Sequence, residues 1–305
     1  MRGHKGGGMR LSVIMTTYNA PVWLEKVLWG FSAQTHKDFE IVIGDDGSGT
    51  ETTDLISDMR EKTGLDIRHV RQEHNGFGKC RILNKAILHA QSEYLVFTDG
   101  DCIPRRDFLE VHAKEAGPGR YLSGGYHRLP MSTSKAISKD DILTGRCFSL
   151  HWLTAHGMAK SFKNLKLITS NNQAHILHRI TTTRCTFKGS NASAWLADAL
   201  KINGFDERMP HGGLDREFGV RLVNMGIRPK HVRYNAIVIH LDHSRSYSDL
   251  KMVKANKALR VSNARHKVSR TEYGISRLIS DGYRPAVDSL AMKLLEKISD
   301  GHRNN

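Results

Sequence analysis

Four short apolar segments in the N-terminal third alternate with stretches of helical periodicity, and this alternation constrains the fold most strongly. The apolar segments comprise residues 11–15, 39–44, 65–70 and 94–97. Pro21 suits the first turn of a helix, and Leu24, Val27, Leu28 and Phe31 follow at helical spacing. Strands that alternate with helices are typical of a parallel, doubly wound sheet, whose right-handed crossovers bring the strand ends to one edge.

The chain is therefore predicted to be an α/β protein with a doubly wound, mostly parallel central sheet flanked by helices. We expect four parts: a disordered tail (1–9), a first half (10–119), a second half (120–247) and a C-terminal helical extension (248–305). The tail is Gly-rich and basic without an apolar segment behind it, so neither a signal peptide nor an anchor is expected there. The extension has an apolar face made of Val287, Leu290, Leu294, Leu295 and Ile298.

The second half is less regular than the first. Its predicted elements are strands at residues 121–126 and 234–239, a loop at the Lys- and Ser-rich residues 131–140, and a helix at residues 142–159. Residues 161–183 are too polar to assign. We expect the segment from Arg120 to Thr186 to be partly mobile and to vary the acceptor side of the site.

The formal net charge of +15 indicates anionic partners, such as nucleotide phosphates, nucleic acid or an acidic membrane. The basic residues are spread along the chain, and neither an RNA-binding aromatic motif nor a zinc-finger spacing occurs, so nucleic acid is not the expected partner. The cysteines, Cys80, Cys102, Cys147 and Cys185, are widely spaced, which favours free thiols in a reducing cytosol. No apolar run is long enough to span a bilayer.

Acid pairs follow two of the predicted strands. Asp99-Gly100-Asp101 ends the fourth segment, and Asp45 and Asp46 follow the second. Open α/β sheets bind ligands at the carboxyl ends of their strands, and crowded carboxylates there suit a Mg²⁺ or Mn²⁺ ion that holds a diphosphate. Both pairs are also common turn chemistry, and Asp45-Asp46-Gly47-Ser48 resembles an Asx-turn with a helix cap. Ligand binding and local turns therefore remain alternatives, with the strand–helix order favouring ligand binding.

The order of these pieces between residues 11 and 245 resembles family 2 glycosyltransferases of the GT-A fold, with a galactosyltransferase-type C-terminal segment. The resemblance implies that Asp46, and secondarily Asp45, holds the uracil of a UDP-sugar. It also implies that Thr17 and Tyr18 line the base pocket. Arg81 lies near the arginine that the family uses around the nucleotide, although the usual Ala-Arg-Asn run is replaced here.

The resemblance makes Asp99-Gly100-Asp101 the D-x-D motif of the family. Asp101 would then coordinate the metal, while Asp99 would contact the ribose or a metal-bound water. His243 resembles the metal-binding histidine of the family, and His240 is the alternative ligand. Imidazole beside carboxylate favours Mn²⁺ over Mg²⁺.

The run 212–217, Gly-Gly-Leu-Asp-Arg-Glu, resembles the Gly-Gly-Glu-Asp-type motif that carries the catalytic base. Asp215 takes that role by alignment of the glycines, and Glu217 is the fallback base, with a capping role expected for one of the two. Leu214 stands where relatives carry an acid, which indicates a different acceptor.

Residues 188–192 resemble the small-residue loop near the transferred sugar. Gly189 would permit close backbone approach, and Asn191 would hydrogen-bond the donor sugar or the acceptor. Trp195 either stacks on a sugar or, as we favour, packs in the core.

Together these features predict an inverting glycosyltransferase that moves a sugar from a UDP-sugar to a saccharide or glycolipid acceptor in bacterial surface polysaccharide or lipopolysaccharide synthesis. We expect it in the cytoplasm, with the basic C-terminal helix as a candidate contact for the inner membrane. One alternative is a nucleotidyltransferase, which would carry a Gly-rich loop where this chain has Thr16-Thr17-Tyr18-Asn19. The other is a non-enzymatic basic protein that binds nucleic acid or membrane.

Overall fold

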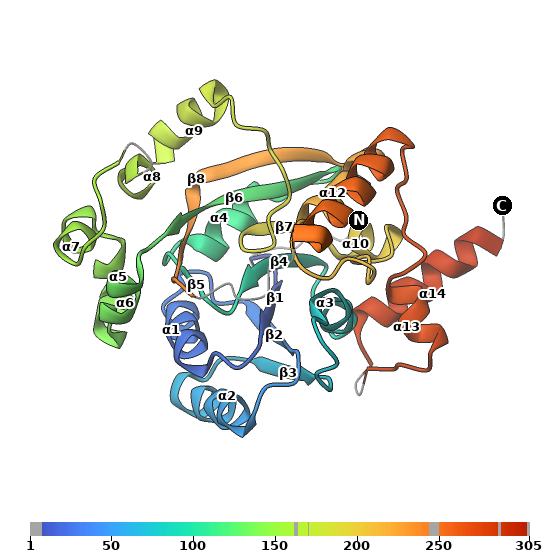
Figure 1. Cartoon of the computed structure of the whole chain (residues 1–305), viewed down its shortest axis with the longest axis horizontal. Helices are drawn as coiled ribbons and strands as arrows, with labels where there is room; N and C mark the ends of the chain where they lie inside the picture. Colours follow the sequence, from blue (N-terminus) through green and yellow to red (C-terminus); the bar gives the residue numbers. More distant parts are fainter. Residues whose placement is uncertain (1–7, 162–163, 170, 244–249, 286–287, 304–305) are drawn as a thin grey trace.

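The computed structural model describes residues 8–161, 164–169, 171–243, 250–285 and 288–303. The described strands form one eight-stranded sheet in the order β3-β2-β1-β4-β7-β6-β8-β5 (Figure 1). They are β1 (Leu11–Thr17), β2 (Phe39–Asp45), β3 (Ile67–Arg71), β4 (Tyr94–Asp99), β5 (Cys102–Pro104), β6 (Arg120–Arg128), β7 (Ala192–Trp195) and β8 (Arg228–His240). Residues 1–7 of the expected tail, and Val287, lie outside the described residues.

Helices cover both faces of this sheet, and β1 contributes Val13 and Met15 to one apolar core and Ile14 to the other. The helices before β7 are α1 (Pro21–Ser32), α2 (Thr50–Thr63), α3 (Lys79–Leu88), α4 (Phe108–Glu115), α5 (Met131–Ala136), α6 (Lys139–Thr144), the 3-10 helix η1 (Arg146–Phe148), α7 (Leu150–Ala155), α8 (Leu165–Ile168) and α9 (Asn171–Ile180). Those after β7 are α10 (Leu196–Lys201), α11 (Leu214–Asn224), α12 (Leu250–Arg265), α13 (Ile275–Ser280) and α14 (Leu290–Arg303).

The predicted parallel half is confirmed. β1 pairs in parallel with both β2 and β4, and β2 pairs in parallel with β3. The apolar stripe of α1 is fully buried, because its members at helical spacing pack on the sheet. The carboxyl ends of β1, β2 and β4 therefore lie at one edge, as the crossover rule requires.

The second half adds antiparallel strands. β7 runs antiparallel to β4, with Phe97 opposite Ala192 and Tyr94 opposite Trp195. Trp195 thus lies at the opposite end of β4 from Asp99, where it packs edge-on against Tyr94 at 5.0 Å between ring centroids. The favoured core role of Trp195 fits this position, and the sugar-stacking alternative does not.

Two predictions for the second half were wrong. The expected loop at 131–140 contains α5 and the start of α6, because Ser138 and Asp141 form a reciprocal capping box. The expected helix over 142–159 is broken, since Gly145 adopts a φ of 80° and ends α6. The unassigned stretch contains α8 and α9.

The C-terminal extension is helical, as predicted. Leu290, Leu294, Leu295 and Ile298 of α14 are partly buried against the core under α3 and α10. Among the described residues, no helix is both long and apolar enough to cross a membrane.

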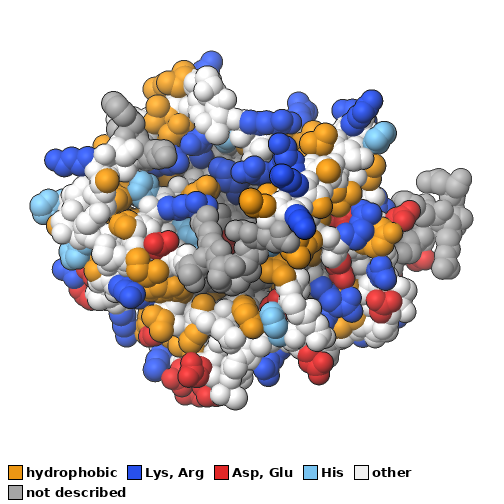
Figure 2. All heavy atoms as spheres, viewed as in Figure 1, with side chains coloured by type: hydrophobic (Ala, Val, Ile, Leu, Met, Phe, Trp, Pro, Cys, Tyr) orange, Lys and Arg blue, Asp and Glu red, His pale blue; other side chains and the backbone are white. Residues whose placement is uncertain are grey.

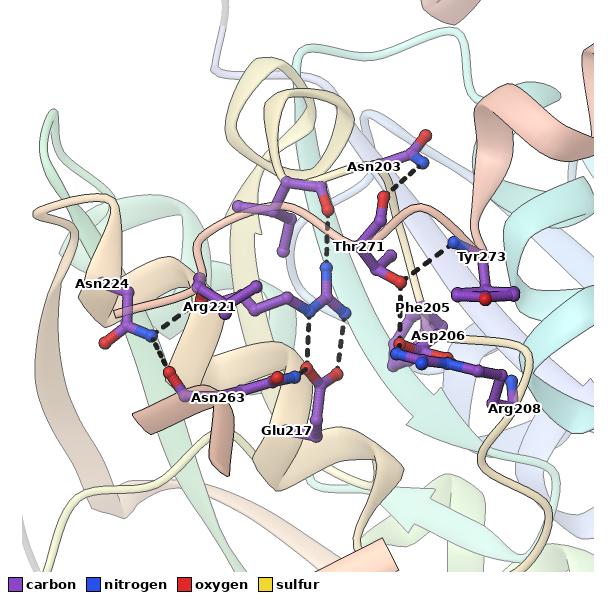
Figure 3. Close-up of polar contacts among 12 residues, drawn as sticks. Asn203, Phe205, Asp206, Arg208, Glu217, Arg221, Asn224, Asn263, Thr271 and Tyr273 are labelled. Atoms are coloured by element: carbon purple, nitrogen blue, oxygen red, sulfur yellow. Dashed lines mark hydrogen bonds and ion pairs between the residues drawn. The ribbon is translucent and has the colours of Figure 1, made fainter. Parts of the chain in front are cut away.

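A buried ion pair ties α11 to the end of α10 before it and to α12 after it (Figure 3). Arg221 donates through Nε and Nη2 to both carboxylate oxygens of Glu217, at 2.7 and 2.8 Å, and through Nη1 to the carbonyl of Ile202 at 2.6 Å. Asn263 of α12 donates to the same Glu217 at 2.9 Å. Both charged side chains are fully buried, so neither can be left unpaired without a large desolvation cost.

Replacing Arg221 with methionine is expected to lower the free energy of unfolding by about 3–5 kcal/mol, because Glu217 would stay buried without its cation. Urea denaturation measures this change. The matched control is Lys62→Met, which removes an exposed i,i+4 pair with Asp58 and should cost only about 0.3–0.5 kcal/mol. Similar losses in the two variants would contradict a stabilising role for the buried pair.

Candidate active site

The sheet brings an acid and an imidazole together from segments that are distant in sequence. Asp101 follows β4, and the short strand β5 begins at the next residue, Cys102. Cys102 lies directly opposite His240, the last residue of β8, and the amide of Leu241 donates to the carbonyl of Asp101 at 2.9 Å. Strand pairing therefore fixes the end of β8 beside Asp101.

Two histidines face the Asp101 carboxylate. His243 Nε2 lies 3.3 Å, and His240 Nε2 3.9 Å, from Asp101 Oδ2. The two rings stack at 5.5 Å with an interplanar angle of 23°. His240 Nδ1 lies 2.8 Å from the carbonyl oxygen of Leu241, an arrangement that holds the ring with Nε2 toward Asp101. One carboxylate oxygen with imidazole nitrogens is a donor set that can hold a divalent metal ion.

Lys79 is a site residue that the sequence interpretation missed. Its Nζ lies 2.6 Å from Asp99 Oδ1, at the start of α3. Burial acts to raise the pKa of Asp99, but the opposing effect of Lys79, His240 and His243 is larger, so the pKa of Asp99 is lowered. Burial likewise opposes the charge of Lys79, yet Asp99, Asp101 and Asp215 together raise its pKa. The available signal was a lysine at the start of a helix that leads to the central strand.

Asp45 and Asp46 are both held by local hydrogen bonds. Asp45 is fully buried and accepts from the Ser48 amide at 2.8 Å, while its other oxygen lies 3.0 Å from His69 Nε2. These contacts match the turn interpretation for Asp45 and leave it no exposed surface for a nucleotide, so the secondary role expected for it is not supported.

Asp46 instead bonds two residues that line a cavity. It accepts from Gln72 Nε2 at 2.6 Å and from the Gly78 amide at 2.9 Å. Gln72 and Gly78 line a cavity of about 320 Å³, whose other lining residues are Glu73, Asn75, Arg81 and Lys85. Arg81 also pairs with Glu207 at 3.0 Å. The structure thus brings the predicted Asp46 and Arg81 to one polar hollow.

The end of β1 lies close to these acids. A Cβ on Gly100 would lie 2.9 Å from the carbonyl oxygen of Thr16, so only glycine fits between the two aspartates. Thr17 is buried, and its hydroxyl has no hydrogen-bond partner in the described structure. Tyr18 is exposed and stacks on His74 at 4.3 Å. Thr17, Tyr18 and Gly100 therefore lie together at the carboxyl ends of β1 and β4, and their contact with a nucleotide stays a prediction.

Asp215 lies in the first turn of α11, after two glycines with φ values of 87° and 83°. Its Oδ2 accepts from the amide of Gly189 at 3.1 Å, and the side chain is half-buried. Asn256 of α12 donates to the carbonyls of His211 and Gly212, both at 2.9 Å, and so holds the glycine loop. Thr98, the neighbour of Asp99, donates to the carbonyl of Ser190 at 3.3 Å, so Asp215, which is bonded to Gly189, lies near the end of β4.

Two predicted site residues are structural instead. Glu217 gives both oxygens to the buried pair with Arg221, so it is not available as a fallback base. Asn191 is fully buried; its Nδ2 donates to the carbonyls of Gly125 and Ala236 at 2.7 and 3.0 Å, and its Oδ1 lies 3.0 Å from His112 Nε2. Asn191 is therefore not available to bind a sugar. The local sequence pattern does not reveal that this side chain is buried.

Several curated proteins are similar to this chain. Chondroitin synthase of Escherichia coli is 28% identical over 241 residues, which cover 71% of this chain and 32% of that protein. Hyaluronan synthase of Pasteurella multocida is 28% identical over 232 residues, covering 71% and 23%. Validoxylamine A glucosyltransferase of Streptomyces hygroscopicus subsp. jinggangensis is 28% identical over 244 residues, covering 78% and 56%. The chain thus spans a third or less of the two synthases.

Solved structures confirm the predicted GT-A fold. S. aureus TarS superposes with a TM-score of 0.56 at 16% identity, covering 90% of this chain and 46% of TarS. The mannosyltransferase PcManGT from Pyrobaculum calidifontis, in complex with GDP-Man and Mn²⁺, gives 0.55 at 17% identity, covering 98% and 81%. In sequence, the family described as Glycosyl transferase family 2 matches residues 12–170, more than half of the chain. The chain therefore belongs to glycosyl transferase family 2.

Proposed function

We propose that this protein transfers a sugar from a UDP-sugar to a saccharide or glycolipid acceptor, with inversion at the anomeric carbon. The observation that carries the proposal is the convergence of Asp101 with His240 and His243, beside Lys79 and on the same side as Asp215. A TarS fragment, similar in fold, was solved in complex with UDP. Relatives named chondroitin synthase and hyaluronan synthase support bacterial polysaccharide synthesis as the setting.

The donor would bind across the strand ends. Asp101 with His243, or alternatively His240, would hold Mn²⁺, which would supply positive charge to the departing diphosphate. Lys79 adds a fixed cation beside Asp99. The hollow lined by Arg81, next to Asp46, is the proposed place for the uracil.

Asp215 is the proposed base. Its carboxylate would accept the proton of the acceptor hydroxyl as that oxygen attacks the anomeric carbon on the face opposite the diphosphate. The amide of Gly189 donates to one carboxylate oxygen and so fixes the rotamer of Asp215. Since inversion needs one displacement, no covalent sugar–enzyme intermediate is required.

Asp101→Asn is expected to abolish the rise in melting temperature that UDP with Mn²⁺ produces in the wild type, because a neutral amide binds a divalent cation poorly. A thermal-shift titration measures it. The control Asp54→Asn changes an exposed acid of α2 and should keep the full shift. An undiminished shift in Asp101→Asn would mean that the nucleotide binds elsewhere.

His243→Ala should raise the Mn²⁺ concentration needed for half of that shift by about tenfold or more, and by more than His240→Ala does, because its Nε2 lies closer to Asp101. The exposed His266 serves as the control position. A larger effect of His240→Ala would reverse the assignment, and equal wild-type behaviour of both variants would remove the histidines from the metal site.

The donor can be identified by incubating the protein with a panel of UDP-sugars and Mn²⁺ and measuring UDP release. With the fastest donor, Asp215→Asn should bind UDP as the wild type does but release it about 10²–10⁴-fold more slowly, since the proton acceptor is lost. Wild-type turnover in this variant would exclude Asp215 as the base.

A further inference from the structure

Three cations lie beside Asp215 in positions that the proposed donor site does not use. Lys188 precedes Gly189, Arg216 follows Asp215 on α11, and Arg233 lies on β8. We call these three residues the cationic cluster. In Figure 2, Lys and Arg side chains gather over the region where Figure 1 draws β8 and the chain between α9 and β7.

A bulge in β8 places Arg233. The pairing of β6 with β8 runs from Gly124 opposite Val232 directly to Gly125 opposite Ile237, so residues 233–236 have no partners in β6. A Cβ on Gly125 would lie only 2.1 Å from the carbonyl oxygen of Arg233, so the bulge requires glycine there. The buried Asn191 amide bonds the carbonyls of Gly125 and Ala236 and closes the bulge. Bulges of this kind commonly redirect a side chain next to an active site.

Arg233 is poorly satisfied where the bulge holds it. Its Nε and Nη1 atoms are buried and have no hydrogen-bond partner in the described part of the chain. Its guanidinium instead lies 5.3 Å from the centre of the Tyr234 ring. Buried donors without acceptors cost free energy, so a ligand that supplies acceptor oxygens would be stabilised at this position.

The two neighbouring cations of the cluster also lack an acidic partner among the described residues. Lys188 Nζ reaches the Gly124 carbonyl at 3.4 Å and the Tyr126 ring at 5.7 Å, and no described carboxylate lies within ion-pair distance of any of the three cations. Burial lowers the pKa of Lys188, and the charges of Arg233 and Arg216 lower it further. Mutual repulsion of this kind is relieved when an anion binds between the cations.

We infer that the cationic cluster binds a phosphate or carboxylate group of an anionic saccharide acceptor, next to the base. The inference rests on the proposed function and names its acceptor class. Lys188 directly precedes Gly189, whose amide donates to Asp215 Oδ2 at 3.1 Å. Lys188 Nζ reaches the Gly124 carbonyl, and Arg233 lies at the bulge against the adjacent Gly125. The cluster therefore lies next to the proposed base, where an acceptor subsite is needed.

Calorimetric titration of the full chain with glucose 6-phosphate, glucuronic acid and glucose tests the inference, in each case with and without saturating UDP and Mn²⁺. Both anions should bind at least about tenfold more tightly than glucose. UDP should not displace them, because the proposed UDP site lies at Asp101 and Lys79 and not at the cationic cluster. Arg233→Gln and Lys188→Gln should each remove the preference for the anions, and Arg233→Lys should keep part of it.

Arg228→Gln is the matched control, since Arg228 is exposed on the same strand and forms no ion pair with another described residue. It should leave anion binding unchanged. Equal binding of glucose, displacement of the anions by UDP, or an equal loss in Arg228→Gln would overturn the inference. Absence of UDP binding alone would contradict the proposed function, while anion binding in the UDP-free arm would still support the cluster as an anion site.

Discussion

The acids that end β4 need compensating positive charge, and the rest of the site depends on how the fold supplies it. Lys79 from α3 pairs with Asp99, whereas Asp101 faces the two imidazoles at the end of β8, where a bound cation would supply the charge. The pairing of β5 with β8 makes this division rigid, because moving His240 away from Asp101 would break the strand pairing. The charges are thus set by backbone pairing more than by side-chain freedom, which is how a preorganised electrostatic site is built.

The seam between the two halves of the sheet rests on a buried polar chain. Tyr94 Oη lies 2.9 Å from Ser193 Oγ, Ser193 Oγ 2.7 Å from His112 Nδ1, and His112 Nε2 3.0 Å from Asn191 Oδ1. Burial lowers the pKa of His112 to about 4, so the imidazole stays neutral and can donate from one nitrogen while accepting at the other. Because Asn191 closes the β8 bulge, the same chain links the start of β4 to the position of Arg233.

The parallel half and the Asp99–Asp101 motif were predictable because both depend on local sequence patterns, namely apolar periodicity and acids at strand ends. The roles of Glu217, Asn191 and Asp45 were not, since an acid or amide in a motif looks the same whether its partners are ligands or buried neighbours such as Arg221. Lys79 escaped notice for the converse reason: its partner is twenty residues away and meets it only across the sheet. The Ser138 capping box was readable and was overlooked among lysines and serines.

A net charge of +15 attracts anions without selecting among them, and selection depends on which cations are already paired. Arg105, Arg208 and Lys230 are neutralised by neighbouring acids and contribute to the long-range field alone. Buried cations without an acidic partner behave differently. Their desolvation cost is incurred when the protein folds, so an anion that binds later gains the full ion-pair interaction without adding that cost again. A cluster of this kind beside Asp215, separate from the proposed metal site at Asp101, would let the acceptor be selected by its charge independently of the donor.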